Sequence, residues 1–237
     1  AKPEGRQLIE NVYRNGRGAL LEAEAKQLLR LHGAAVTADV MAATADAAAD
    51  AAAGMGGKVV LKIVSPDILH KSDANGVRLD LGGRENVKKA FREIIRNAKA
   101  YKADARIEGV LVSPMVDHGI EVIIGTKIDD QFGPVIMYGL GGVMVEILKD
   151  VSFRVLPISR RSAQRMIAET KSHPILDGAR GDHPYDKKSL VTLLLVCSEL
   201  IESYPEIQEM DLNPVIVHHE GLSVVDARIL LKPASHR

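Results

Sequence analysis

At 237 residues, the chain is long enough for one large domain or two small ones, and it can bury a sizeable core without disulfides or a structural metal. Lysine and arginine together number 31, as do aspartate and glutamate, so the composition excludes a strongly basic protein built for nucleic acid or an anionic membrane. Hydrophobic residues make up 46% of the chain, but there are only five tyrosines, three phenylalanines and no tryptophan, which indicates an aliphatic core of the kind that suits an α/β protein.

The single cysteine, Cys197, lies in the apolar run VTLLLVCSEL and has no second cysteine for a disulfide or a thiolate metal site. We interpret it as a core residue, because a catalytic cysteine needs an exposed and electropositive setting. No stretch reaches the roughly 20 uninterrupted apolar residues of a membrane span, and the first residues lack the apolar centre of a signal peptide. We therefore expect a cytoplasmic protein.

The N-terminal part predicts an extension followed by helices and strands. Residues 1–19 are polar and interrupted by glycines, so we expect an extension or an interdomain linker. The segment LLEAEAKQLLRLHG (20–33) repeats apolar residues at helical spacing and ends in a glycine, which predicts an amphipathic helix. Thr44 can cap the alanine-rich helix that follows it. The runs KVVLKIV (58–64) and VRLDL (77–81) read as strands that flank a polar loop.

The second half is richer in strands. A helix is expected from Val87, and further helices from Ser159 and around 190–201. Predicted strands follow in the order VLVSPMV, EVIIGTKI and PVIMYG, with a closing pair MDLNPVIVHH and LSVVDARIL joined at Glu220 and Gly221. Adjacent strands in this order favour an α+β or mixed α/β fold over a doubly wound sheet. We expect two lobes, residues 20–112 and 113–237, after the extension 1–19.

Two familiar phosphate-binding motifs are absent, since there is neither a GxxxxGK[ST] sequence nor a GxGxxG between a strand and a helix. A P-loop NTPase and a Rossmann dinucleotide enzyme are therefore disfavoured. Lys62, by contrast, lies in the middle of an apolar strand, where it can supply a positive charge to a phosphate. The alternative is a lysine that extends its charged end to solvent at the edge of the strand.

The loop HKSDANG is the first candidate for chemistry. It places His70 beside a polar turn whose Asn75 and Gly76 are suited to positive φ. Backbone N–H groups in such a loop can bind phosphate oxygens, and a histidine can act as acid, base or phosphoryl acceptor. A plain exposed histidine is the alternative.

Two further polar clusters occur in the second half. The glycine-rich GLGG (139–142), followed by Glu146 and Asp150, allows a close approach of a ligand to the backbone, although a turn explains it nearly as well. Asp211 and Asn213 share one face of a strand by their two-residue spacing, and Asp226 lies on the partner strand. Oxygen ligands of this kind suit a Mg²⁺ ion that bridges nucleotide phosphates. A polar strand face is the alternative.

From about Leu20 to Leu231 the sequence resembles the ATP-grasp subunit or domain of NDP-forming acyl-CoA synthetases, a family that includes the ADP-forming acetyl-CoA synthetases. The resemblance is carried, in order, by LLEAEAKQLLRLHG, VVLKIVSPDILHKSDANGV, GIEVIIGTKIDDQFGPVIMYGLGGVMVEILKDVSFRVLPI, GARGDHPYDKKSL, EMDLNPVIV and VVDARI. It implies an ATP-grasp fold, in which two α/β lobes hold ATP or ADP between them, and a relation to the β subunit of succinyl-CoA synthetase.

The resemblance also implies roles for individual residues. Lys62 would contact the nucleotide phosphates and Glu121 the ribose, while His70 would accept phosphate transiently. The segment along the adenine would comprise Ser113, Pro114, Met115 and Val116. Asn213 and Asp226 match the Mg²⁺ ligands, and Asp211 stands beside them as a further catalytic candidate. One departure is Asn75, which precedes Gly76 where the family usually has two glycines.

The function implied is that of the nucleotide-binding subunit or domain of an ADP-forming acyl-CoA synthetase, which converts an acid, CoA and ATP into acyl-CoA, ADP and phosphate. The carboxylic acid and CoA would bind to a partner α subunit or domain that carries a second phosphorylatable histidine. One alternative is a nucleotide-sensing module fused to a protein acetyltransferase, which needs a binding cleft but no phosphohistidine. Another is a self-sufficient ATP-grasp ligase that makes acyl phosphates for amine acceptors.

Overall fold

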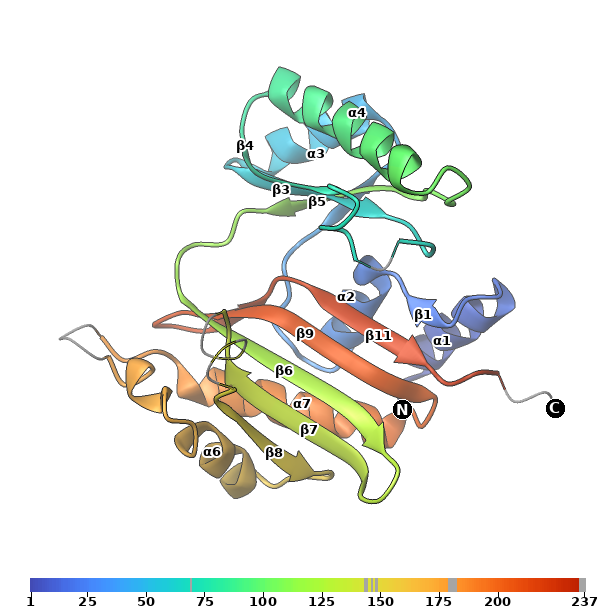
Figure 1. Cartoon of the computed structure of the whole chain (residues 1–237). Coiled ribbons are helices and arrows are strands. Elements are labelled where there is room, and N and C mark those ends of the chain that lie inside the picture. Colours follow the sequence, from blue (N-terminus) through green and yellow to red (C-terminus); the bar gives the residue numbers. More distant parts are fainter. Residues whose placement is uncertain (69, 143–144, 146, 148, 179–182, 235–237) are drawn as a thin grey trace. The chain divides into compact units, whose positions relative to one another are not determined.

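The computed structural model shown in Figure 1 describes residues 1–234 except 69, 143–144, 146, 148 and 179–182. The chain forms two compact units. The first comprises Ala1–Val36 and His118–Arg237, and the second comprises Thr37–Asp117. Each unit has its own sheet and its own hydrophobic core. This mixture of helices and antiparallel strands confirms the predicted α+β class.

The unit of residues 37–117 is a four-stranded antiparallel sheet with strand order β2-β5-β3-β4. Helices α3 and α4 pack together against one face of it, as Figure 1 shows. Its elements are β2 (Val40–Ala42), α3 (Ala45–Met55), β3 (Val59–Val64), β4 (Val77–Leu81), α4 (Arg84–Tyr101) and β5 (Gly109–Pro114).

Local sequence explains where helix α3 begins and ends. Thr44 has extended backbone, and its side-chain oxygen accepts a hydrogen bond of 3.1 Å from the Ala47 N–H, as the sequence predicted. At the other end Gly56 takes the left-handed conformation with φ 71°, which terminates the helix without the cost that a side chain would bring.

The unit of residues 1–36 and 118–237 contains a seven-stranded sheet with strand order β1-β11-β9-β6-β7-β8, and β10 also pairs with β9. Its helices are α1 (Pro3–Arg14), α2 (Glu22–Leu31), α6 (Arg160–Ala168), the 3-10 helix η1 (His173–Ile175) and α7 (Lys187–Ser203). Its strands are β1 (Ala19–Leu20), β6 (Ile120–Asp129), β7 (Gly133–Leu140), β8 (Val151–Val155), β9 (Ile207–Val217), β10 (Leu222–Val224) and β11 (Ala227–Leu231). None of the helices described is both long and apolar enough to span a lipid bilayer.

The two faces of this sheet differ in character. Alternate residues such as Ile124, Tyr138 and Leu212 belong to the core, which α2 and α7 complete with their apolar sides. The intervening residues point to the opposite face, where Lys127 is exposed and Asp211 is half-buried. In Figure 1, α7 runs behind β6 and β7, on the side of the sheet where the core lies. Polar side chains such as Lys127 and Asp211 lie on the opposite face.

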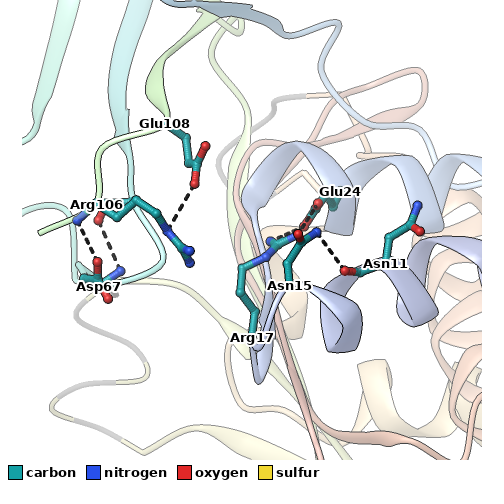
Figure 2. A network of polar contacts seen from close by, with 8 residues as sticks. Asn11, Asn15, Arg17, Glu24, Asp67, Arg106 and Glu108 are labelled. Atoms are coloured by element: carbon teal, nitrogen blue, oxygen red, sulfur yellow. Dashed lines mark hydrogen bonds and ion pairs between the residues drawn. The ribbon is translucent and has the colours of Figure 1, made fainter.

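The predicted division into 1–19, 20–112 and 113–237 differs from the units of the structure. Residues 1–19 are not a linker, because helix α1 buries Leu8, Ile9 and Val12, and β1 pairs with β11. Figure 2 shows the polar side of this segment, where Arg17 forms an ion pair of 2.7 Å with Glu24. The second boundary lies beyond residue 112, because β5 stays paired with β3 as far as Pro114.

Gly76 is expected to be required for the fold of the second unit. A Cβ atom there would lie 2.4 Å from Ile63 Cγ2 and 3.0 Å from the Lys71 carbonyl oxygen. Gly76→Ala should therefore lower the free energy of unfolding by about 1–3 kcal/mol in urea denaturation. Gly54→Ala is the matched control, since nothing lies within 4 Å of that position in helix α3, and it should raise stability by up to about 1 kcal/mol. A Gly76→Ala protein as stable as the wild type would contradict this packing.

Candidate functional site

Lys62 is buried within strand β3, with only 5% of its surface exposed. Val59, Leu61 and Ile63 point into the core under helices α3 and α4, so Lys62 points to the other face of the sheet. It pairs with Leu111 of β5 and Val77 of β4. The lysine therefore does not lie at the edge of the sheet, which disfavours the alternative of a solvated strand-edge residue.

Ser113 shares that face with Lys62, because it lies two residues further along β5 from the position opposite the lysine. It is 1% exposed, and its hydroxyl has no hydrogen-bond partner among the described residues. The chain continues through Pro114 to Met115, whose N–H donates to the Lys58 carbonyl oxygen at 2.8 Å. Met115 itself is 43% exposed, and Val116 is half-buried. The structure thus brings Lys62 and the predicted adenine segment together.

The loop between β3 and β4 presents His70 as an exposed side chain. Both of its ends are fixed. Before His70, Asp67 accepts a hydrogen bond of 2.7 Å from the Arg106 N–H, as seen in Figure 2. After His70, the Gly76 N–H donates to Lys71 and the Ile63 N–H donates to Gly76, at 2.8 and 2.7 Å.

Asn75 adopts φ 47° in this loop, as its residue type allows. Its carbonyl oxygen accepts hydrogen bonds from the side chains of Arg78 and Asn97, at 3.1 and 3.2 Å. Asparagine therefore tolerates the positive φ that the loop requires at this position. The result is an exposed histidine on the loop between β3 and β4, whose backbone is hydrogen-bonded on both sides of the histidine.

Glu121 lies at the start of β6 with its side chain exposed. Its carbonyl oxygen accepts a hydrogen bond of 2.7 Å from Gly141 N–H. A Cβ atom at Gly141 would lie 3.1 Å from the Glu121 Cβ, so the glycine permits this close approach of two backbone segments. The GLGG sequence thus has at least one structural explanation, next to the residue predicted to bind ribose.

Asp211 and Asn213 lie on β9, and Asp226 immediately precedes β11, which pairs with β9. Ala227 pairs with Leu212, and the Val225 N–H donates to the Pro214 carbonyl oxygen, so Asp226 lies across from Asn213. Between the pairs Val122–Val215 and Ile124–Leu212, strand β9 has one residue more than β6. This bulge contains Asn213 and turns its side chain away from the core, where it is exposed.

The electrostatic setting of Asp211 links the three residues. Burial raises the pKa of its carboxyl group, the positive charge of Arg228 opposes this rise, and the carboxylates of Glu209 and Asp226 add to it. Arg228 lies directly across from Asp211 in the strand register. The carboxylates of Asp211 and Asp226 are thus near enough to interact.

A pocket of about 460 Å³ opens on the same face of the sheet. Gly125 forms part of its floor between Asp211 and Met137, and Phe153 lies beside Met137 on the next strand. A Cβ atom at Gly125 would meet nothing closer than 3.6 Å, so packing within the fold does not demand a glycine there. A glycine within a strand often marks a place where a ligand approaches the backbone.

Other candidates have structural explanations or lie outside the described residues. Asp150 accepts hydrogen bonds from the Lys171 and Ser172 N–H groups and from the Ser172 hydroxyl. Burial alone would raise its pKa, but these hydrogen bonds lower it below the usual value. Glu146 is not among the described residues. Cys197 is fully buried, which raises its pKa to about 12 and confirms it as a core residue.

His218 and His219, which follow strand β9, make two separate contacts. His218 contacts the Ser223 hydroxyl at 3.2 Å, whereas the ring of His219 stacks on Tyr185. Within the part of the chain that the structure describes, no three His, Cys, Asp or Glu side chains gather to hold a metal ion. The predicted Mg²⁺ ligands are one amide and one carboxylate, a pair whose remaining partners would be nucleotide phosphates and water.

Sequence reasoning missed Glu209, Arg228 and Gly125. The signal was available in part, since Arg228 follows Asp226 by two residues and must share its strand face. The pairing of Arg228 with Asp211, however, depends on the register of β9 and β11.

One unit carries a buried lysine within a strand of its sheet, and the other carries an amide and two carboxylates at neighbouring strands. Residues 11–231 match the family model described as an ATP-grasp domain. The chain therefore belongs to the ATP-grasp family. Its fold agrees with the resemblance drawn from the sequence.

Two curated relatives show the extent of the similarity. The chain is 50% identical over 234 residues to the beta subunit of acetate–CoA ligase (ADP-forming) II of Pyrococcus furiosus, covering 98% of this chain and 99% of that subunit. It is 47% identical over 230 residues to acetate–CoA ligase (ADP-forming) I of Archaeoglobus fulgidus. That match covers 97% of this chain but only 33% of the longer protein.

Solved structures agree with the fold. A structure of acetyl-coenzyme A synthetase 1 from Ca. Korarchaeum cryptofilum with coenzyme A and Ca-AMPCP superposes with a TM-score of 0.93 at 46% identity, covering 96% of this chain and 100% of that one. Another structure of that enzyme contains coenzyme A and Mg-AMPPCP, and its phosphohistidine segment points towards the nucleotide binding site. It has a TM-score of 0.84 and 43% identity, with the same coverage.

Proposed function

We propose that this chain is the nucleotide-binding subunit or domain of an ADP-forming acyl-CoA synthetase, which makes acyl-CoA, ADP and phosphate from an acid, CoA and ATP. The observation that carries the proposal is the exposed His70 on an anchored loop, directly after the strand that contains Lys62. The similarity to a beta subunit over nearly the full length of both chains supports it.

In this proposal His70 is the acceptor in a phosphohistidine relay. An imidazole nitrogen attacks the γ-phosphorus of ATP, the bond to the β-phosphate oxygen breaks, and ADP leaves. The phosphoryl group then passes to the carboxylate of the acid to give an acyl phosphate, and the thiol of CoA displaces phosphate from it. A protein supplies mainly positioning and charge for such transfers.

Each candidate binding residue would contact one part of the nucleotide. Lys62 would neutralise charge on the phosphates, Glu121 would bind the ribose hydroxyls, and Ser113 to Val116 would lie along the adenine. The buried Ser113 hydroxyl has no hydrogen-bond partner among the described residues. Because buried polar groups normally have a partner, this hydroxyl is suited to form a hydrogen bond with the nucleotide. We therefore propose that the chain binds ATP as substrate and ADP as product.

Asn213 and Asp226 would hold Mg²⁺, because Asn213 of β9 and Asp226, just before β11, present an amide and a carboxylate oxygen across from each other. Such hard oxygen donors fit this cation. When bound, the ion would neutralise charge on the β- and γ-phosphates. Asp211, two residues along the strand from Asn213, would orient the phosphoryl acceptor.

The acid and CoA would bind to a partner α subunit or domain with a second phosphorylatable histidine. The Archaeoglobus relative, of which this chain matches one third, leaves room for such a domain in one polypeptide. We further propose a cytoplasmic location, because the reaction consumes ATP and CoA. Neither nucleic acid nor a membrane is part of the proposal.

The test is to incubate the chain with γ-labelled ATP and Mg²⁺, alone and with a CoA-binding subunit, and to measure acid-labile phosphate on His70. We expect stoichiometric labelling, and formation of acyl-CoA and ADP when acid and CoA are added to the two subunits. Nucleotide binding without labelling in either condition would overturn the relay. That result would favour the alternative, a nucleotide-sensing module, for which an exposed histidine is unnecessary.

A further inference from the structure

Four charged side chains lie together on the face of the seven-stranded sheet that its helices do not cover. Strand β9 carries two acidic residues there, and each neighbouring strand, β6 and β11, carries one basic residue. Lys127 of β6 pairs in register with Glu209 of β9, and Asp211, two residues further along β9, pairs with Arg228 of β11. Arg228 Nη2 lies 2.7 Å from Glu209 Oε1. The guanidinium is therefore held between two strands rather than extended into solvent, and only 30% of its side chain is exposed.

The position of Arg228 relates it to the proposed Mg²⁺ ligands. Arg228 of β11 lies two residues after Asp226, and Asp211 of β9 lies two residues before Asn213. The pair Arg228–Asp211 therefore forms one row on this face, and the pair Asp226–Asn213 forms the next. Rows two residues apart are separated by about 7 Å. An arginine side chain spans that distance. Arg228 also lines the pocket whose floor includes Gly125.

Arginine has five N–H donors in a planar group, and the hydrogen bond to Glu209 uses one of them. The carboxylate fixes the direction of the plane and leaves other donors for a ligand. A planar cation beside the terminal phosphate of a nucleotide can stabilise the negative charge that spreads over the phosphoryl oxygens during transfer. A purely structural ion pair would need neither the pocket nor the adjacent row of oxygen ligands.

We propose that Arg228 is a catalytic residue, which contacts the phosphoryl group as it moves between the nucleotide and its acceptor, and that Glu209 is its positioning residue. This inference rests on the proposed phosphohistidine relay. The pocket on the Gly125 side of Arg228 then receives the acceptor, with Met137 and Phe153 as its apolar wall.

The experiment measures the single-turnover rate of His70 labelling by γ-labelled ATP, with nucleotide affinity measured separately. Arg228→Gln should slow labelling about 100-fold, while the Kd for ATP changes less than about threefold. Arg228→Lys should recover part of the rate, because it keeps the charge but loses the fixed plane. Glu209→Gln should cause a smaller loss of rate at unchanged affinity.

Arg154→Gln is the matched control. Arg154 forms an ion pair of 2.6 Å with Glu169 in the same unit, and it points to the helix-covered face of the same sheet. It should label at the wild-type rate. The role of Arg228 alone would be overturned if Arg228→Gln were folded, as judged by circular dichroism, and its His70 labelling rate were within threefold of the wild-type rate. A wild type that binds ATP without any labelling would overturn the relay and this inference together.

Discussion

Replacing His70 with alanine is expected to abolish acyl-CoA synthesis by the chain and its partner, with a fall in kcat of about 10⁴-fold or more. The imidazole is the proposed phosphoryl acceptor, and alanine offers no nucleophile in its place. His70 is exposed, so the change should leave folding stability nearly unaltered. The measurements are acyl-CoA formation, ADP release and labelling by γ-labelled ATP in the same preparation.

If His70→Ala loses activity but keeps its affinity for ATP, the loss is due to the missing phosphoryl acceptor and not to a change in folding. His70→Ala should bind ATP with the wild-type Kd, because the residues proposed to hold the nucleotide are unchanged. His173→Asn is the control, since His173 contacts Asp177 at 3.1 Å in the other unit and has no part in the proposal. A His70→Ala enzyme that still forms acyl-CoA at the wild-type rate would show that phosphate does not pass through this residue.

Asp226→Asn is expected to slow His70 labelling about 10³-fold and to raise the Mg²⁺ concentration needed for half-maximal activity. The substitution keeps the size of the side chain but removes the negative charge proposed to bind the cation. Charge stabilisation by a bound cation contributes several kcal/mol in phosphoryl transfer, and each 1.4 kcal/mol corresponds to a factor of ten in rate. A Mg²⁺ titration of the labelling rate provides the measurement.

The control for this substitution is Asp130→Asn, at an exposed acid in the turn between β6 and β7. It removes one negative charge from the same unit without touching β9 or β11, so both the rate and the Mg²⁺ requirement should stay at wild-type values. If Asp226→Asn and Asp130→Asn gave the same Mg²⁺ dependence, Asp226 would not be a ligand of the ion.

Local patterns in the sequence determined many elements of this protein. The alanine-rich helix α3 begins at its predicted cap, Thr44, because a threonine oxygen satisfies an N–H group of the first turn wherever that turn forms. Strand β3 was predicted from its β-branched run, and Lys62 within it was noticed because a charge among apolar neighbours is unusual. Residue patterns singled out Lys62, His70, Asp211, Asn213 and Asp226, whereas Glu121 and the segment from Ser113 to Val116 came only from the resemblance to the acyl-CoA synthetase family.

The prediction that residues 1–19 form an extension or linker was wrong, because average composition does not show how apolar residues are spaced. Residues 1–19 are polar on average, yet Leu8, Ile9 and Val12 form one apolar face at helical spacing, and that face is buried against the core. The boundary at residue 112 failed differently. A strand ends where its pairing ends, and β5 remains paired with β3 up to Pro114.

What only the tertiary structure decided is how residues far apart in sequence meet. Asn213 faces Asp226, and Asp211 faces Arg228, because β9 and β11 pair in one register, while a bulge turns Asn213 away from the core. A shift of one residue would send these side chains to the opposite face. That register is set by burial of the alternate apolar residues, such as Leu212 and Ile229, against helices elsewhere in the chain. Long-range packing of this kind leaves no signal in a local stretch of sequence.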